Sequence, residues 1–105
     1  MNTKSTISFE EAYLIALKQA ESILSFYLKS ADIPVLTQHF MEAPYCWMFF
    51  RNKEIIIPKE HSLADGAYVV SKKGSFRHVA DFSSEPEKLQ AYLLTMSNHF
   101  KEKGE

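Results

Sequence analysis

The sequence predicts an α+β domain of two layers, in which an antiparallel sheet of about four strands packs on an N-terminal and a C-terminal helix. Near both ends of the chain, apolar residues recur at intervals of three and four, the period of a helix. Between them lie short runs of β-branched and aromatic residues separated by turn residues. Consecutive strands pair as hairpins, and we expect the two terminal helices to cover one face of the sheet.

Composition fits a single domain. The chain has 105 residues, of which 46% are hydrophobic and 24% charged, as in globular proteins. We expect residues 1–7 and 103–105 to be flexible.

The net charge of −1 argues against binding to nucleic acid or to an anionic membrane surface. No apolar run exceeds six residues, far short of a spanning helix, and two glutamates interrupt the region where a signal peptide would lie. We therefore expect a cytoplasmic protein.

The first helix has a clear start. Ser8-Phe9-Glu10-Glu11 has the form of a capping box, in which the Ser8 hydroxyl accepts from the amide of Glu11 and the Glu11 carboxylate accepts from the amide of Ser8. An apolar stripe follows it, so we predict a helix from about residue 9 to about residue 30. Pro34 cannot continue this helix.

The middle of the chain predicts strands. Residues 35–42 have no cleanly apolar face, whereas residues 45–51 are apolar on both faces. This pattern indicates a central strand, covered on both sides or covered on one side and adhesive on the other. Residues 67–71 and 76–80 form a further hairpin, with Gly74 available for a positive φ in its turn.

The other segments are a short β-branched piece and the longest loop. Residues 55–57 are all isoleucine, and Pro58 stops them. The polar loop 58–66 follows, with a helical turn expected around residues 62–65.

The second helix begins at Ser84-Glu85-Pro86-Glu87, which is another capping signature, with Ser84 at the capping position and proline in the first turn, and we predict that the helix runs to about residue 102. Apolar residues then recur from Leu89 to Phe100, and Gly104 suits the end of the helix.

Catalytic and metal-binding signatures are not evident. The histidines His39, His61, His78 and His99 lie far apart in the sequence and lack the short-range pair of a typical zinc site. Cys46 lies within an apolar strand, where a thiol packs as a small hydrophobe. The sequence contains no Gly-x-Ser-x-Gly elbow and no glycine-rich phosphate loop. We therefore predict no catalytic residues, no metal and no cofactor.

A protein-binding patch is the favoured interpretation of the remaining features. Tyr45, Trp47 and Arg51 are residue types that interfaces favour, and they lie on or beside the aromatic strand. The mixed-charge loop after this strand adds Glu54, Glu60 and Asp65 as candidate contact residues.

Four segments together resemble the immunity protein 35 (YrhB-like) family. They are Ile33-Pro34-Val35, Cys46 to Phe50, Leu63 to Val70, and Lys72-Lys73-Gly74-Ser75, and the resemblance covers roughly residues 10–95. The sequence departs from the family pattern in the loop that could contact a partner, where Asp65-Gly66 stands in place of Gly-Asn. The resemblance implies a small bacterial protein that neutralises a cognate toxin by binding and occluding it, without catalysis.

Two alternatives remain open at this stage. A small holdase chaperone would use an exposed apolar patch, which the aromatic strand could supply if one of its faces is open. An enzyme of unrecognised type would bring His39, His61 or His78 together with a carboxylate in a cleft. A homodimer is compatible with any of these functions, since the sheet has edges that a second copy could pair with.

Overall fold

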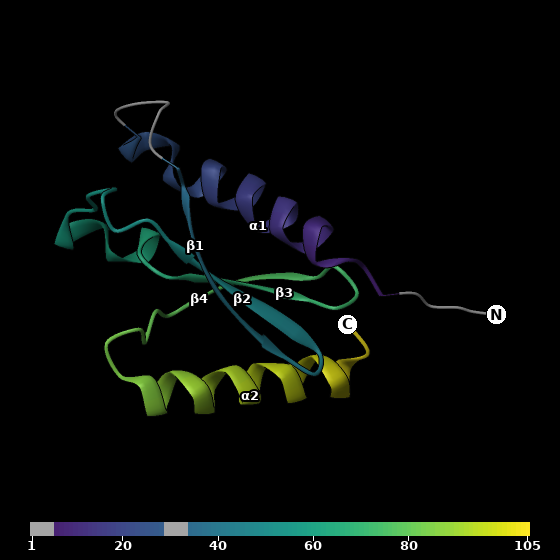
Figure 1. Ribbon diagram of the computed structural model, residues 1–105. Helices are drawn as coiled ribbons and strands as arrows, with labels where there is room; N and C mark the ends of the chain where they lie inside the picture. The colour runs from purple at the N-terminus through teal and green to yellow at the C-terminus, as the bar shows by residue number, and fades with distance from the viewer. Residues whose placement is uncertain (1–5, 29–33) are drawn as a thin grey trace.

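The computed structural model in Figure 1 describes residues 6–28 and 34–105. Its elements are, in chain order, α1 (Phe9–Leu24), a 3-10 turn η1 (Ser25–Tyr27), β1 (Leu36–Ala43), β2 (Cys46–Arg51), a 3-10 segment η2 (Lys59–Ala64), β3 (Ala67–Ser71), β4 (Phe76–Val79) and α2 (Pro86–Lys103). The four strands form one antiparallel sheet in the order β1-β2-β3-β4, so β1 and β4 are its edges. This confirms the α+β fold with two helices and a four-stranded sheet.

The predicted two-layer arrangement is wrong, because the helices lie on opposite faces of the sheet (Figure 1). Trp47 and Phe49 of β2 pack in the cluster under α1, whereas Met48 and Phe50 of the same strand pack in the cluster over α2. A strand that is apolar on both faces needs a cover on each side. The molecule therefore has three layers, with β2 and β3 buried in the middle.

Helix α1 begins as predicted, with both hydrogen bonds of the capping box between Ser8 and Glu11 present. Three of its fully buried residues, Ala12, Ala16 and Ala20, follow one another at intervals of four. Their small side chains let the helix backbone lie close to the sheet. The α-helix ends at Leu24 and tightens into η1, and the last part of the predicted helix falls in residues 29–33, outside the described residues.

Helix α2 begins differently from the prediction. Its N-cap is Glu85, whose side chain makes no capping bond, so the predicted role of Ser84 is wrong. Pro86 occupies the first turn, where its missing N–H costs no hydrogen bond. Gly104 ends the helix in the left-handed conformation at φ 71°, as predicted.

The turns and loops follow the sequence in most places. Gly74 has φ 99° in the β3–β4 turn, as predicted. Helical structure in the long loop spans η2 and so begins earlier than residue 62, while residues 55–57 form no strand. Within residues 6–28 and 34–105, no helix has both the length and the hydropathy that a bilayer span requires.

Candidate binding groove

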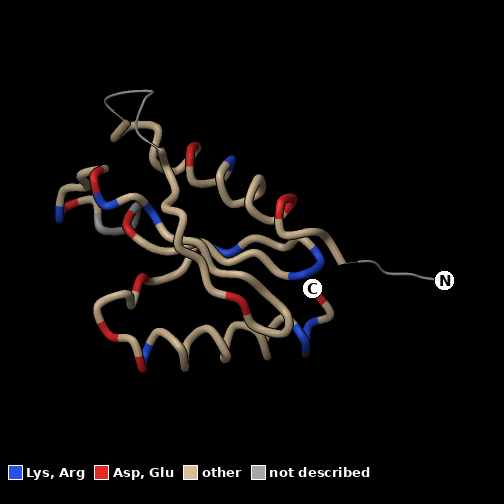
Figure 2. Tube along the Cα trace, in the orientation of Figure 1, with Lys and Arg blue, Asp and Glu red and all other residues tan. Residues whose placement is uncertain are grey.

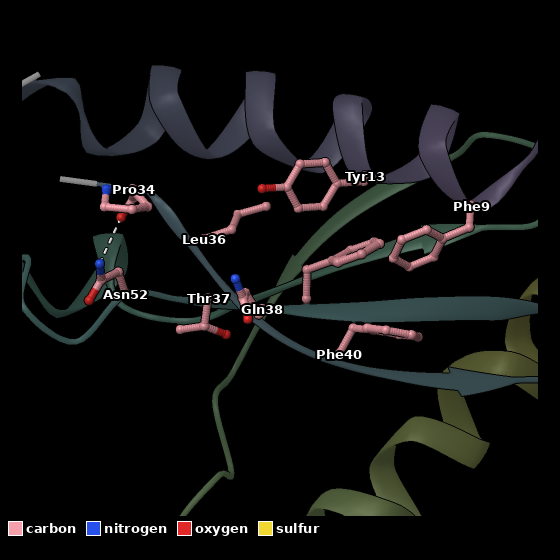
Figure 3. A pocket seen from close by; sticks show the side chains of 9 residues that line it. Phe9, Tyr13, Pro34, Leu36, Thr37, Gln38, Phe40 and Asn52 are labelled. Atoms are coloured by element: carbon pink, nitrogen blue, oxygen red, sulfur yellow. Dashed lines mark hydrogen bonds between the residues drawn. The ribbon is translucent and has the colours of Figure 1, made fainter. Parts of the chain in front are cut away.

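One part of the sheet is left uncovered on the α1 side. Helix α1 packs mainly over β2 and β3, whereas α2 packs over β2 and β1 on the other face. The α1-facing side of the edge strand β1 therefore forms one wall of an open groove of about 620 Å³. Figure 3 shows this groove, with the helix above it and β1 crossing below.

Aromatic side chains line one end of the groove. Phe9 and Tyr13 descend from α1, Phe40 comes from β1, and Phe49 of β2 completes the apolar surface. The ring centroids of Phe9 and Phe40 lie 4.6 Å apart, and those of Tyr13 and Phe49 lie 5.8 Å apart. These separations are typical of packed aromatic pairs, so the wall is held in place by its own contacts.

A bulge in β1 supplies a polar lip. Leu36 pairs with Arg51 and Phe40 pairs with Phe49, so the three residues from Thr37 to His39 face the single residue Phe50. The Thr37 hydroxyl accepts a hydrogen bond of 3.2 Å from the amide of His39, which stabilises the bulge locally. Thr37 and Gln38 then line the groove beside Phe40.

Asn52 fixes the end of the groove furthest from Phe9. Its side-chain amide donates to the Pro34 carbonyl at 2.9 Å, as the dashed line in Figure 3 marks. Its backbone N–H donates to the Val35 carbonyl at 2.9 Å, and its side-chain oxygen accepts from the amide of Glu54 at 3.0 Å. These bonds tie the start of β1 to the loop after β2. Tyr13 points its hydroxyl toward this end (Figure 3).

The groove is electrically neutral, since none of its nine lining residues carries a formal charge. Figure 2 shows β1 free of charged positions except Glu42. That carboxylate forms an ion pair with Lys72, whose ammonium lies 4.2 Å from the centroid of the Trp47 ring. The groove therefore offers apolar surface and neutral hydrogen-bonding groups.

Two of the predicted contact residues, Trp47 and Arg51, are buried and expose little surface. Trp47 is 5% exposed and belongs to the core under α1. Arg51 is 7% exposed and donates to the Ile55 carbonyl at 2.6 Å and to the Asp65 carboxylate at 2.8 Å. The side chain of Arg51 therefore ties the loop between β2 and β3 to the end of β2.

The other predicted contact residues are exposed but do not form one patch. Tyr45 lies in the β1–β2 turn, where its backbone N–H donates to the Ser97 hydroxyl at 2.9 Å. Glu54, Glu60 and Asp65 lie beyond the opposite end of β2. The strand between them spans roughly 20 Å at about 3.3 Å per residue.

The groove residues were not predicted as a site. The apolar stripe that contains Phe9 and Tyr13 indicated only a buried helix face. The one available signal was the mixed pattern of residues 35–42, because a strand with neither face cleanly apolar is typical of a sheet edge.

Tyr68 of β3 and His78 of β4 form a pair of polar rings on the α1 side of the sheet. The rings of Tyr68 and His78 stack with centroids 5.2 Å apart. Burial raises the pKa of Tyr68 to about 12. Burial lowers the pKa of His78, although the negative charge of Asp65 partly offsets this by raising it. Neither the Tyr68 hydroxyl nor Nε2 of His78 has a hydrogen-bond partner among the described residues. This pair is the closest approach to the chemistry that the enzyme alternative requires.

The geometry of that alternative is not formed by residues 6–28 and 34–105. Nδ1 of His61 lies 2.7 Å from the Tyr27 hydroxyl, and the His39 ring stacks on Phe50 at 4.9 Å. Within those ranges no histidine pairs with a carboxylate, and no group of three or more potential ligands could hold a metal ion.

Comparison of the chain with protein-family models, with curated proteins and with solved structures found no match.

Proposed function

We propose that this protein is a non-enzymatic binding module for another protein. The observation that carries the proposal is the groove between α1 and the edge strand β1, which combines an aromatic wall with a polar lip. Apolar surface bordered by hydrogen-bonding groups is the composition of a protein interface. The aromatic side chains of the wall pack against one another, and a surface ordered before binding lowers the entropic cost of binding.

The resemblance to the immunity protein 35 family supports a specific form of this proposal. In that form the protein acts in the cytoplasm of a bacterium and neutralises a cognate toxin by covering its active site or another surface that the toxin needs. Steric occlusion requires a stable shape and a complementary surface and no reacting groups.

Co-purification and rescue of growth test this proposal together. The tagged chain is co-expressed with the product of the gene encoded beside it, in cells that this product would harm. We expect the two proteins to elute as one complex and the cells to grow. A neighbouring product that neither binds the chain nor is neutralised by it would count against the proposal.

The holdase alternative loses the observation that motivated it. It required the aromatic strand to be open on one face, but Trp47 and Phe49 are buried under α1 and Phe50 is buried over α2. Suppression of the aggregation of an unrelated client protein by the purified chain would restore this alternative.

A further inference from the structure

We infer that the groove binds an extended, uncharged segment of the partner, which pairs with the edge of β1 and inserts an apolar side chain against Phe9, Tyr13 and Phe40. This inference rests on the proposed function and names the chemistry of the partner segment. It combines the free strand edge, the apolar wall and the neutrality of the groove.

The edge of β1 supplies the backbone groups. Within residues 6–28 and 34–105, β1 pairs with β2 on one side and with no strand on the other. From Phe40 to Ala43 the register with β2 is continuous, so this part of β1 has the regular geometry that an added strand needs. The bulge from Thr37 to His39 interrupts the ladder, so we place the pairing at Phe40–Ala43 and the side-chain contacts of Gln38 beside it.

Apart from the bulge, the edge of β1 has few of the features that keep strands from pairing. Lysine or proline on an edge strand prevents an added chain from pairing with it. Residues 36–43 contain neither, and their one charge, Glu42, is neutralised by Lys72. Two exposed side chains lie on the regular part of the edge: the apolar Phe40, which is 42% exposed, and Glu42, whose side chain is 54% exposed in its ion pair with Lys72.

The absence of charged residues from the lining favours a neutral segment. All nine residues that line the groove are uncharged, so an ionised side chain placed against them would lose water without gaining a counter-charge. An aromatic or large aliphatic side chain would instead bury its surface against the rings of Phe9, Tyr13 and Phe40. The amide of Gln38 and the hydroxyl of Tyr13 can bond with peptide groups at the rim.

Selection of peptides from a phage library of random nonapeptides tests the inference. The bait is the full chain, compared with Phe40→Lys and with the matched control Leu94→Lys, which alters an apolar side chain of α2 that is 45% exposed. We expect selected peptides to be neutral, to contain an aromatic or large aliphatic residue, and to bind wild type and Leu94→Lys equally. Binding to Phe40→Lys should be at least about tenfold weaker, because the lysine projects into the apolar wall.

A second measurement needs no variant protein. Synthetic versions of a selected peptide with N-methyl groups on alternate backbone amides lose the donors of an added strand on one edge. One of the two methylated registers should bind at least about tenfold more weakly than the other if the peptide pairs with β1. Equal binding of both registers, equal binding to Phe40→Lys and wild type, or selection of charged peptides would overturn the inference.

Two further outcomes separate this inference from the proposed function. If the co-encoded partner binds Phe40→Lys as tightly as wild type, the protein is a binding module but the groove is not its site. If wild type sediments as a dimer and Phe40→Lys as a monomer, the groove is occupied by a second copy of the chain and the inference fails. If the co-encoded protein does not bind at all, the peptide selection still tests the groove alone.

Discussion

At the scale of single residues, Gly66, directly before β3, lies close against β4. A Cβ atom on Gly66 would lie 2.4 Å from the Val79 carbonyl oxygen and 2.6 Å from Nε2 of His78. The absence of a side chain here allows His78 to lie flat on Tyr68 with its Nε2 buried. Space, rather than backbone conformation, therefore requires glycine at this position.

Gly66→Ala should destabilise the fold by about 1–3 kcal/mol, the usual cost of overpacking, because the carbonyl of Val79 is backbone and cannot rotate away. Urea unfolding of the variant and the wild type measures this difference. Gly104→Ala is the matched control, since a Cβ there meets nothing within 4 Å and only its positive φ carries a cost. A Gly66→Ala protein as stable as wild type would show that β4 can move aside.

The burial of His78 predicts a pH dependence. Burial lowers the pKa of His78 below its ordinary value of 6.5, so the unfolded chain takes up this proton at a higher pH than the folded one. Stability is then complete above that value and decreases as the pH falls below 6.5. Burial raises the pKa of Asp81, but the hydrogen bonds from Lys53 and Ser83 together lower it below its ordinary value of 3.8. The contribution of Asp81 to stability is therefore lost only as the pH falls below 3.8, well below the range in which His78 acts.

The urea midpoints at about pH 7.5 and about pH 5.5 measure the effect of His78. We expect the urea midpoint of the wild type to be lower at about pH 5.5 than at about pH 7.5. The midpoint of His78→Gln should decrease less, because the glutamine side chain does not titrate. His61, His39 and His99 remain in both proteins and provide the internal reference. Equal falls in the two proteins would assign the pH dependence to another group.

At the scale of elements, the two helices begin in different ways despite similar sequence signatures. Ser8 caps α1 with its hydroxyl, whereas Ser84 lies one residue before the N-cap of α2, which makes no side-chain bond. Pro86 supplies the fixed φ that starts α2. The same four-residue pattern therefore has different energetic weight at the two helices.

Ser8→Ala should cost about 1 kcal/mol, because it removes the acceptor for the amide of Glu11 and half of the capping box. Ser84→Ala is the matched control and should change stability by less than about 0.5 kcal/mol, as expected of an exposed residue with no cap to lose. Urea or thermal unfolding of the two variants checks both values. Equal losses would show that Ser84 caps α2 in solution.

Local sequence signals predicted most of the elements, and the groove shows where they stop. The capping box, strand β3 and the Gly74 turn follow from side chains within a few residues of one another. The groove depends on how far α1 extends across the sheet and on the bulge in β1. Both are set by packing between distant segments, which no periodic pattern along one segment specifies.

At the scale of the whole molecule, the sheet separates two apolar clusters. Leu24 closes the cluster on the α1 side, and Leu93 and Cys46 belong to the cluster on the α2 side. The sequence indicates that β2 is apolar on both faces, but the apolar stripe of a helix does not specify which face of the sheet that helix covers. Since β2 and β3 contribute side chains to both clusters, we expect the three layers to unfold as one cooperative unit.

Cys46 provides a probe of this cooperativity. Its thiol is fully buried, and burial raises its pKa to about 11 despite the nearby charge of Lys72. A thiol reagent at neutral pH should therefore react with it only when the molecule opens. If opening is global, the labelling rate reports the population of the unfolded state, and a substitution in the distant α1-side cluster should raise it.

Leu24→Ala removes buried side-chain volume from that distant cluster and should cost about 2–5 kcal/mol. Each 1.4 kcal/mol changes a population about tenfold, so labelling of Cys46 should accelerate roughly 30-fold to several thousand-fold. Leu14→Ala is the matched control, because Leu14 lies on the same helix but is 61% exposed and should change the rate by no more than about twofold. Unchanged labelling in Leu24→Ala would mean that α2 detaches from the sheet on its own, and the three layers would then be two independent units.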